Sequence, residues 1–128
     1  MSYYFSKTLD VGFDQAVERV TEALKEQGFG IVSTIDVQDT LKRKLDVAFR
    51  PYRILGACNP TLAFEALSAE DKVGTMLPCN VVVQAWGDRS TEVAAIDPMA
   101  SMQAIANPML EATARNVRAR LQKVVESL

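Results

Sequence analysis

The sequence predicts an α+β protein: a mostly antiparallel sheet of five strands, with two long helices on one face and short helices inserted between strands, in the order β-α-β(4)-α. Three observations support this prediction. Strand-like and helix-like segments do not alternate regularly, unlike the repeated units of a doubly wound parallel sheet. Two long segments, one near each end of the chain, carry apolar residues at helical spacing. The apolar runs between them are short and bounded by turn residues, as strands are.

The chain begins with a predicted strand over residues 2–8, which partly alternates and is rich in Tyr and Phe. Residues 13–26 follow as an amphipathic helix, because apolar side chains recur every three or four residues and charged ones fill the other face. Gly28 lies just past the last turn, where glycine commonly ends a helix. Residues 29–35 form a β-branched run that predicts the second strand.

The middle of the chain carries two short helices and two strands. Residues 39–45 are predicted to form a short helix capped by Asp39. After the break at Pro51, residues 52–58 form the third strand. The pair Asn59-Pro60 then begins a helix that extends to about Glu70, because Asn is a favourable N-cap and Pro is favoured at the first helical position. The near-continuous apolar run over residues 76–86 predicts a central fourth strand.

The last third of the chain closes the sheet. Residues 87–90 make a turn, residues 91–96 return as the fifth strand, and Asp97 ends it. Pro108 begins a helix that runs almost to the C-terminus. Its apolar face is a candidate dimer surface, with Val117, Leu121 and Val124. The sheet face opposite the long helices must be covered by the inserted helices, a second copy of the chain or a ligand.

Composition and charge indicate one domain over residues 1–128. The apolar share of 48% and the charged share of 23% are ordinary for a soluble globular protein of this length. A net charge of −2 does not suggest a nucleic-acid partner, which would require a basic face. The N-terminal residues lack the pattern of a secretion signal, and no apolar stretch is long enough to span a bilayer. We therefore expect a cytoplasmic protein without a membrane partner, whose thiols stay reduced.

The chain contains no histidine, and this removes several mechanisms. A Ser-His-Asp triad or a Cys-His pair cannot form within one chain. The common histidine-based zinc sites are excluded as well. The sequence therefore predicts no catalytic residues and favours a binding protein over an enzyme.

The two cysteines are the most informative residues. Each is followed by an asparagine and lies beside a proline, in the segments Cys58-Asn59-Pro60 and Pro78-Cys79-Asn80. A helix and a short loop connect the two segments, so we expect their strands to be neighbours and the thiols and amides to converge on one pocket. The start of a helix beside Cys58 would make its thiol more reactive. The alternative, that both cysteines are small apolar packing residues, has similar weight.

Arg53 and Asp97 are further candidates for this site. Arg53 flanks the third strand and could bind an anion with its bidentate guanidinium group. Asp97 closes the fifth strand and could accept a hydrogen bond at the same edge of the sheet. A surface ion pair and a turn cap are the simpler interpretations of these residues. The methionines around the following loop are expected to fill gaps in apolar packing, namely Met99, Met102 and Met109.

These segments also carry a resemblance. With FRPYRILGACNP (49–60), LPCNVVV (77–83) and IDP (96–98), the chain is similar to the prokaryotic family catalogued as domain of unknown function 302. The resemblance implies a fold similar to the TATA-binding protein, with a curved five-stranded antiparallel sheet, and a tendency to form homodimers. It implies no activity. The characteristic positions of the family fall on Cys58, Asn59, Pro60, Pro78, Cys79 and Asn80.

Three functions remain open at this point. The first is a module that binds a small molecule or a soft metal ion such as copper(I), which suits thiolate ligands. Its site would comprise Cys58, Asn59, Cys79, Asn80, Arg53 and Asp97. The second is a homodimeric structural or interaction protein in which the cysteines only pack. The third is a thiol redox protein in which Cys58 attacks and Cys79 resolves.

Overall fold

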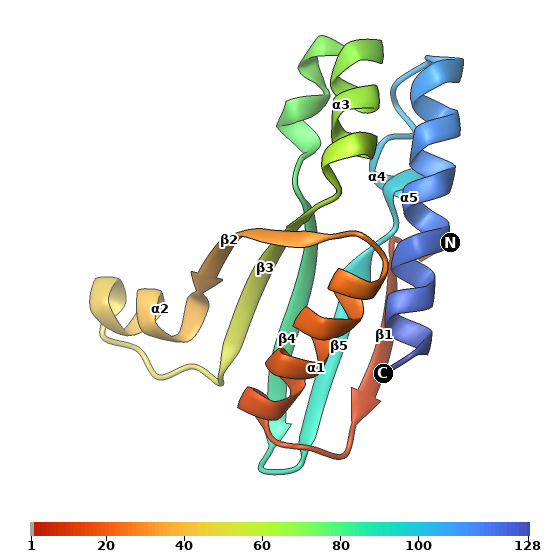
Figure 1. The fold of residues 1–128 in the computed structure, drawn as a ribbon. Helices are drawn as coiled ribbons and strands as arrows, with labels where there is room; N and C mark the ends of the chain where they lie inside the picture. Colours follow the sequence, from red (N-terminus) through yellow and green to blue (C-terminus); the bar gives the residue numbers. More distant parts are fainter. Residues whose placement is uncertain (1) are drawn as a thin grey trace.

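The computed structural model describes residues 2–128, so Met1 lies outside it. Figure 1 shows a sheet with helices around it and a group of helices beyond one of its ends. The elements are β1 (Tyr4–Leu9), α1 (Phe13–Glu26), β2 (Gly30–Asp36), α2 (Val37–Leu45), β3 (Tyr52–Cys58), α3 (Pro60–Ala69), η1 (Asp71–Met76), β4 (Cys79–Gly87), β5 (Ser90–Ile96), α4 (Pro98–Ser101) and α5 (Pro108–Glu126). The strand order is β1-β5-β4-β3-β2, and every neighbouring pair is antiparallel. The predicted α+β class and five-stranded sheet are confirmed.

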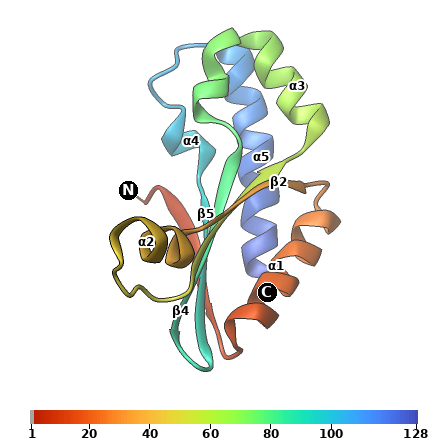
Figure 2. The ribbon, with the colours of Figure 1, turned by 90° about the vertical axis from the view of Figure 1, so that its left-hand side faces the viewer.

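Alternation along the central strands divides the sheet into two faces. Successive side chains of a strand point to opposite faces, so every second residue shares an environment. On β4 the buried side chains are Cys79, Val81 and Val83. The intervening residues belong to the other face, where Asn80 is exposed. Helices α1 and α5 cover the first face, and α2 lies on the opposite side (Figure 2).

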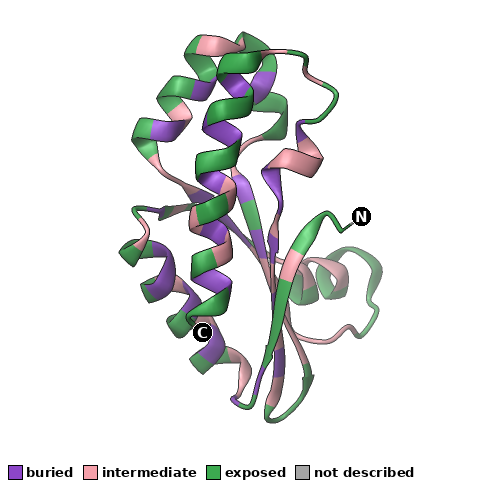
Figure 3. Ribbon diagram, turned by 90° about the vertical axis from the view of Figure 1, so that its right-hand side faces the viewer, coloured by how far each residue is buried: buried purple, intermediate pink, exposed green. Residues whose placement is uncertain are grey.

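The two long helices bury their apolar faces against the sheet (Figure 3). Helix α1 ends before Gly28, whose φ of +84° is the left-handed conformation that glycine adopts without strain. On α5, the predicted dimer surface is wrong: Val117, Leu121 and Val124 are at most 9% exposed because they pack into the core of their own chain. These side chains are therefore not available to a second copy.

Beyond the end of the sheet, α3, η1, α4 and the first half of α5 form a second apolar cluster. Two of these elements differ from the sequence prediction. Residues 76–78 do not belong to the fourth strand, because η1 continues to Met76 and the strand begins only at Cys79. Helix α4 was not predicted, and it forms because the Asp97 carboxylate accepts a hydrogen bond from the N–H of Met99 at 3.0 Å.

The outer face of the sheet is only partly covered by α2. This helix begins at Val37 rather than at residue 39, because Asp36, not Asp39, caps it by accepting a hydrogen bond from the N–H of Asp39 at 2.9 Å. Beside it, the Arg50 guanidinium lies 4.1 Å from the centre of the Trp86 ring. None of the helices in residues 2–128 has the length and apolar character needed to cross a membrane.

Candidate functional site

A cavity of about 320 Å³ lies where the sheet meets the second apolar cluster. Its walls come from the ends of β3 and β4 and from α3, η1, α4 and α5. Four of its lining residues have polar or thiol side chains, namely Cys58, Asn59, Cys79 and Thr113, and the others are apolar or glycine. The cavity therefore offers a largely hydrocarbon surface with a few polar groups.

Small residues on facing helices keep this space open. Helix α3 contributes Ala63 and Ala66, and α5 contributes Ala114. Each of these positions projects only one methyl group from the helix surface. Larger residues of the same two helices, such as Leu62 and Leu110, also line the cavity and are buried. The volume thus follows from where the alanines fall along the two helices.

The thiols approach each other because β3 and β4 are neighbours in the sheet. Ala57 on β3 is the register partner of Cys79 on β4, and Cys58 is the next residue of β3. Cys79 is 7% exposed, whereas Cys58 is half-buried, and both thiols are free. The sequence-based expectation that the two cysteine segments lie in neighbouring strands agrees with this register.

The thiol of Cys79 is held in its protonated form. Burial in the apolar wall, together with a smaller contribution from the nearby Cys58 sulfur, raises the pKa of Cys79 from its usual 9.0 to about 11. At neutral pH this side chain is therefore an uncharged thiol and a weak nucleophile. Within residues 2–128, no three His, Cys, Asp or Glu side chains come together in a group that could hold a metal ion.

Asn59 is both a residue of the cavity wall and the N-cap of α3. Its side-chain oxygen accepts a hydrogen bond from the N–H of Leu62 at 3.2 Å, as predicted for the N-cap of α3. Its amide nitrogen lies against Gly28, only 2.8 Å from the position that a Cβ would take there. The left-handed glycine therefore leaves room for Asn59, and the α1–β2 turn positions this part of the rim.

Three of the sequence-predicted site residues lie elsewhere. Asn80 follows the inward-facing Cys79 and lies on the outer face of the sheet, where it lines a separate, more open groove. Arg53 is 3.9 Å from the carboxylate of Asp36, and its guanidinium lies 5.0 Å from the centre of the Phe13 ring. Asp97 does not share an edge with Arg53.

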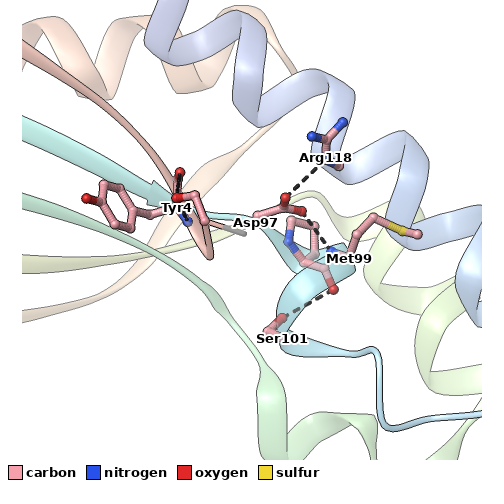
Figure 4. Close-up of polar contacts among 7 residues, drawn as sticks. Tyr4, Asp97, Met99, Ser101 and Arg118 are labelled. Atoms are coloured by element: carbon pink, nitrogen blue, oxygen red, sulfur yellow. Dashed lines mark hydrogen bonds and ion pairs between the residues drawn. The ribbon is translucent and has the colours of Figure 1, made fainter.

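Asp97 instead fixes the position of α4 (Figure 4). Its carboxylate caps this helix through Met99 and accepts a hydrogen bond from Nε of Arg118 on α5 at 3.1 Å. Only 8% of Asp97 is exposed. The residue thus anchors α4 to α5, and α4 in turn carries Pro98 to the wall of the cavity, where Met102 follows it.

Several lining residues were not identified from the sequence as a site. Thr113 and the alanines of α3 and α5 looked like ordinary members of amphipathic helices. Met102 fills a gap as predicted, at 8% exposure, whereas Met109 is 72% exposed and fills none. The available signal was the clustering of alanine on the apolar faces of two helices, but which faces meet depends on the tertiary packing.

Comparison with known proteins relates the chain to one family. The family model described as "Domain of unknown function DUF302" matches residues 5–128. Among solved structures, the chain is similar to an uncharacterized conserved protein DUF302 from Bacillus stearothermophilus, with 28% sequence identity and a TM-score of 0.89. The similarity covers 98% of each chain. A search of curated proteins found no match.

Proposed function

The chain belongs to the family described as "Domain of unknown function DUF302", and on this premise we propose that it binds a small, uncharged, apolar molecule in the cavity beside Cys58 and Cys79. The observation that carries this proposal is the combination of an open volume of about 320 Å³ with an almost wholly apolar lining. Cavities that hold small organic ligands begin at about 300 Å³ and are mostly apolar with a few placed polar groups.

The lining favours a neutral ligand. None of the lining residues is Lys, Arg, Asp or Glu, so an ion that entered would lose hydration without gaining a charged partner. An apolar molecule would instead lose unfavourable contact with water and gain dispersion contacts. Cys58 and Asn59, both half-buried, can offer a hydrogen bond to one polar group of such a ligand.

The soft-metal variant of this function has less support. A metal such as copper(I) binds thiolates, and the raised pKa of Cys79 means that its proton must first be displaced at neutral pH. Metal analysis of protein purified without chelator decides between the variants. Stoichiometric copper that is lost in a Cys58→Ser protein would support the metal variant and count against the organic ligand.

Binding can be tested with N-phenyl-1-naphthylamine, an uncharged apolar dye whose fluorescence rises when it leaves water. We expect saturable binding to the wild-type protein. Ala114→Leu adds bulk to the cavity wall and should weaken binding at least tenfold, whereas Ala119→Leu adds the same bulk at an exposed position of the same helix and should not. Absence of saturable binding, or equal binding by both variants, would contradict the proposal.

A homodimeric interaction protein is the second candidate, and one observation favours it. The incompletely covered outer face carries exposed apolar side chains, with Ile35 at 50% and Trp86 at 58% exposure. A sheet face that is only partly covered and carries exposed apolar side chains can bind another copy of the chain. Sedimentation velocity would test this: we expect Ile35→Lys to dissociate a dimer, and a wild-type monomer at high concentration would rule out this candidate.

A reversible Cys58–Cys79 disulfide is the third candidate, favoured by the nearness of the two thiols, which line the same cavity and influence each other electrostatically. In the oxidation, both thiols lose a proton and together give two electrons to hydrogen peroxide, so that one disulfide and two water molecules form. Thiol titration before and after peroxide measures it. Two free thiols remaining after treatment would exclude this function without affecting the proposed ligand site.

A further inference from the structure

We infer that the ligand of this cavity is a linear alkyl chain, which runs along α5 and passes Met102 into a second hollow. This inference rests on the function proposed above and adds the class of ligand. It follows from the length of the cavity, from the second hollow that shares its wall, and from the distribution of polar groups.

The cavity follows about two turns of α5. The residues of this helix that line it extend from Leu110 to Val117. At 1.5 Å of rise per residue, this stretch is about 10 Å long. On the facing helix α3, the lining residues extend from Leu62 to Leu67 in the same way. A slot between two helices, opened by single methyl groups of alanine, suits a narrow extended molecule better than a broad one.

A second hollow of about 210 Å³ continues the slot. It shares Met102, Leu110 and Ala114 with the first cavity, so these three side chains form a common wall. Its other lining residues are the apolar Met99 and Ile105 and the polar Gln103 and Glu111. Met102 is the most adaptable of them, because its side chain is unbranched and rotates about three bonds. A rotation of Met102 would join the two hollows, and Met99 lines only the second one.

The polar groups of the cavity indicate how the alkyl ligand is oriented. Near the sheet, the half-buried Cys58 and Asn59 provide hydrogen-bonding groups at the rim. Further from the rim, Ala66 and Ala114 present only methyl groups, and the hydroxyl of Thr113 already donates to the Glu65 carboxylate and the Met109 carbonyl, both at 3.3 Å. A molecule with one uncharged polar end and a long hydrocarbon tail matches this order. Its polar end would lie at the rim, and its tail would pass Met102 and contact Met99 and Ile105 rather than the Gln103 and Glu111 side of the second hollow. A primary alcohol is the simplest molecule of this class.

The test uses protein labelled with ¹³C at the methionine methyl groups and titrated with butanol, hexanol and octanol, all linear primary alcohols. Because burying each methylene is worth about 0.8 kcal/mol, we expect affinity to rise up to about fourfold per carbon atom. Octanol should shift the methyl signals of both Met102 and Met99, whereas butanol is too short to extend from the rim beyond Met102 and should leave Met99 unchanged. The exposed Met109 serves as the internal control and should stay unchanged.

The outcomes separate this inference from the proposed function. Three results would refute a linear alkyl ligand: affinity that stops rising at hexanol, a Met99 signal that never responds, or cyclooctanol that binds as tightly as octanol. The proposed binding of an uncharged apolar molecule, tested with the dye, would be unaffected by them. If neither the dye nor any alcohol binds, both proposals fail. Met102→Phe should block the passage, so that butanol still binds but octanol loses its advantage and its effect on Met99. Should this variant not fold, the Met99 signal of the wild-type protein decides alone.

Discussion

Gly56 offers a sharp test of the packing that brings the two cysteine segments together. Its neighbours leave no room for a side chain: an added Cβ would lie 2.6 Å from Cγ of Pro78 and 2.1 Å from Oγ of Ser33. Gly56 is the register partner of Asn80, so the Pro78 ring lies over the backbone of the adjacent strand just before Cys79. Gly56→Ala should therefore displace the entry to β4 and, with it, the cysteine wall of the cavity.

The magnitude follows from these contacts. The Cγ of Pro78 would be 0.8 Å inside the 3.4 Å at which ordinary contact begins, and the ring cannot rotate away. The hydroxyl of Ser33 is exposed and can turn aside at little cost. Overpacking of this kind costs about 1–3 kcal/mol, and we expect the free energy of unfolding in urea to fall by about 2 kcal/mol.

Two control variants separate the possible causes. Gly30→Ala, on the neighbouring strand β2, places the same methyl group where no atom lies within 4 Å, and it should change stability by less than about 0.5 kcal/mol. The double variant Gly56→Ala/Ser33→Ala removes the contact with the hydroxyl and should remain destabilised. If Gly56→Ala is as stable as Gly30→Ala, or if removing Ser33 restores stability, the assignment to Pro78 is wrong.

Three further predictions concern the groups around the cavity. The pKa of Cys79 is raised from 9.0 to about 11 in the folded protein, so the unfolded chain loses this proton first as the pH rises. The free energy of unfolding should therefore fall by up to about 3 kcal/mol between pH 9 and pH 11. In urea unfolding, Cys79→Ala should show a smaller change over the same pH range. Iodoacetamide at pH 8 should modify the half-buried Cys58 well before Cys79, as peptide mass spectrometry would show, and equal rates would contradict the described burial. Asp97→Asn keeps a capping side chain but loses the charge beside Arg118, so we expect the free energy of unfolding to fall by about 1 kcal/mol. Asp97→Ala also removes the cap and should lower it by about 1 kcal/mol more. Equal thermal stability of the two variants would argue against the cap.

Local signals predicted much of the fold. The Asn59-Pro60 start of α3 was identifiable because a cap and a first-turn proline act within a few residues. The third strand, Tyr52–Cys58, was predicted with its observed bounds because it is a short apolar run between Pro51 and that cap. The sequence prediction started the fourth strand too early, at Met76, and missed helix α4. In both places a single turn or one capping side chain, rather than an apolar pattern, determines the local structure.

The candidate site was only partly predictable for a different reason. Strand adjacency correctly suggested that the two cysteine segments are neighbours. The expectation that Asn80 joins them overlooked the alternation of side chains, which sends the residue after an inward Cys79 to the opposite face. Asp97 pairs with Arg118, 21 residues away on another helix, and no short-range pattern encodes that contact. The cavity itself depends on which faces of α3 and α5 meet.

The central claim is that an uncharged apolar molecule enters the cavity between α3 and α5 beside the two thiols. Its most direct test is a crystal structure of the protein soaked with 1-bromonaphthalene, whose bromine is located by anomalous scattering. We expect one strong bromine peak in the cavity, in contact with the side chains near Cys79. A bromine that binds only in the groove on the outer face, or no ordered bromine at saturating concentration, would contradict the claim.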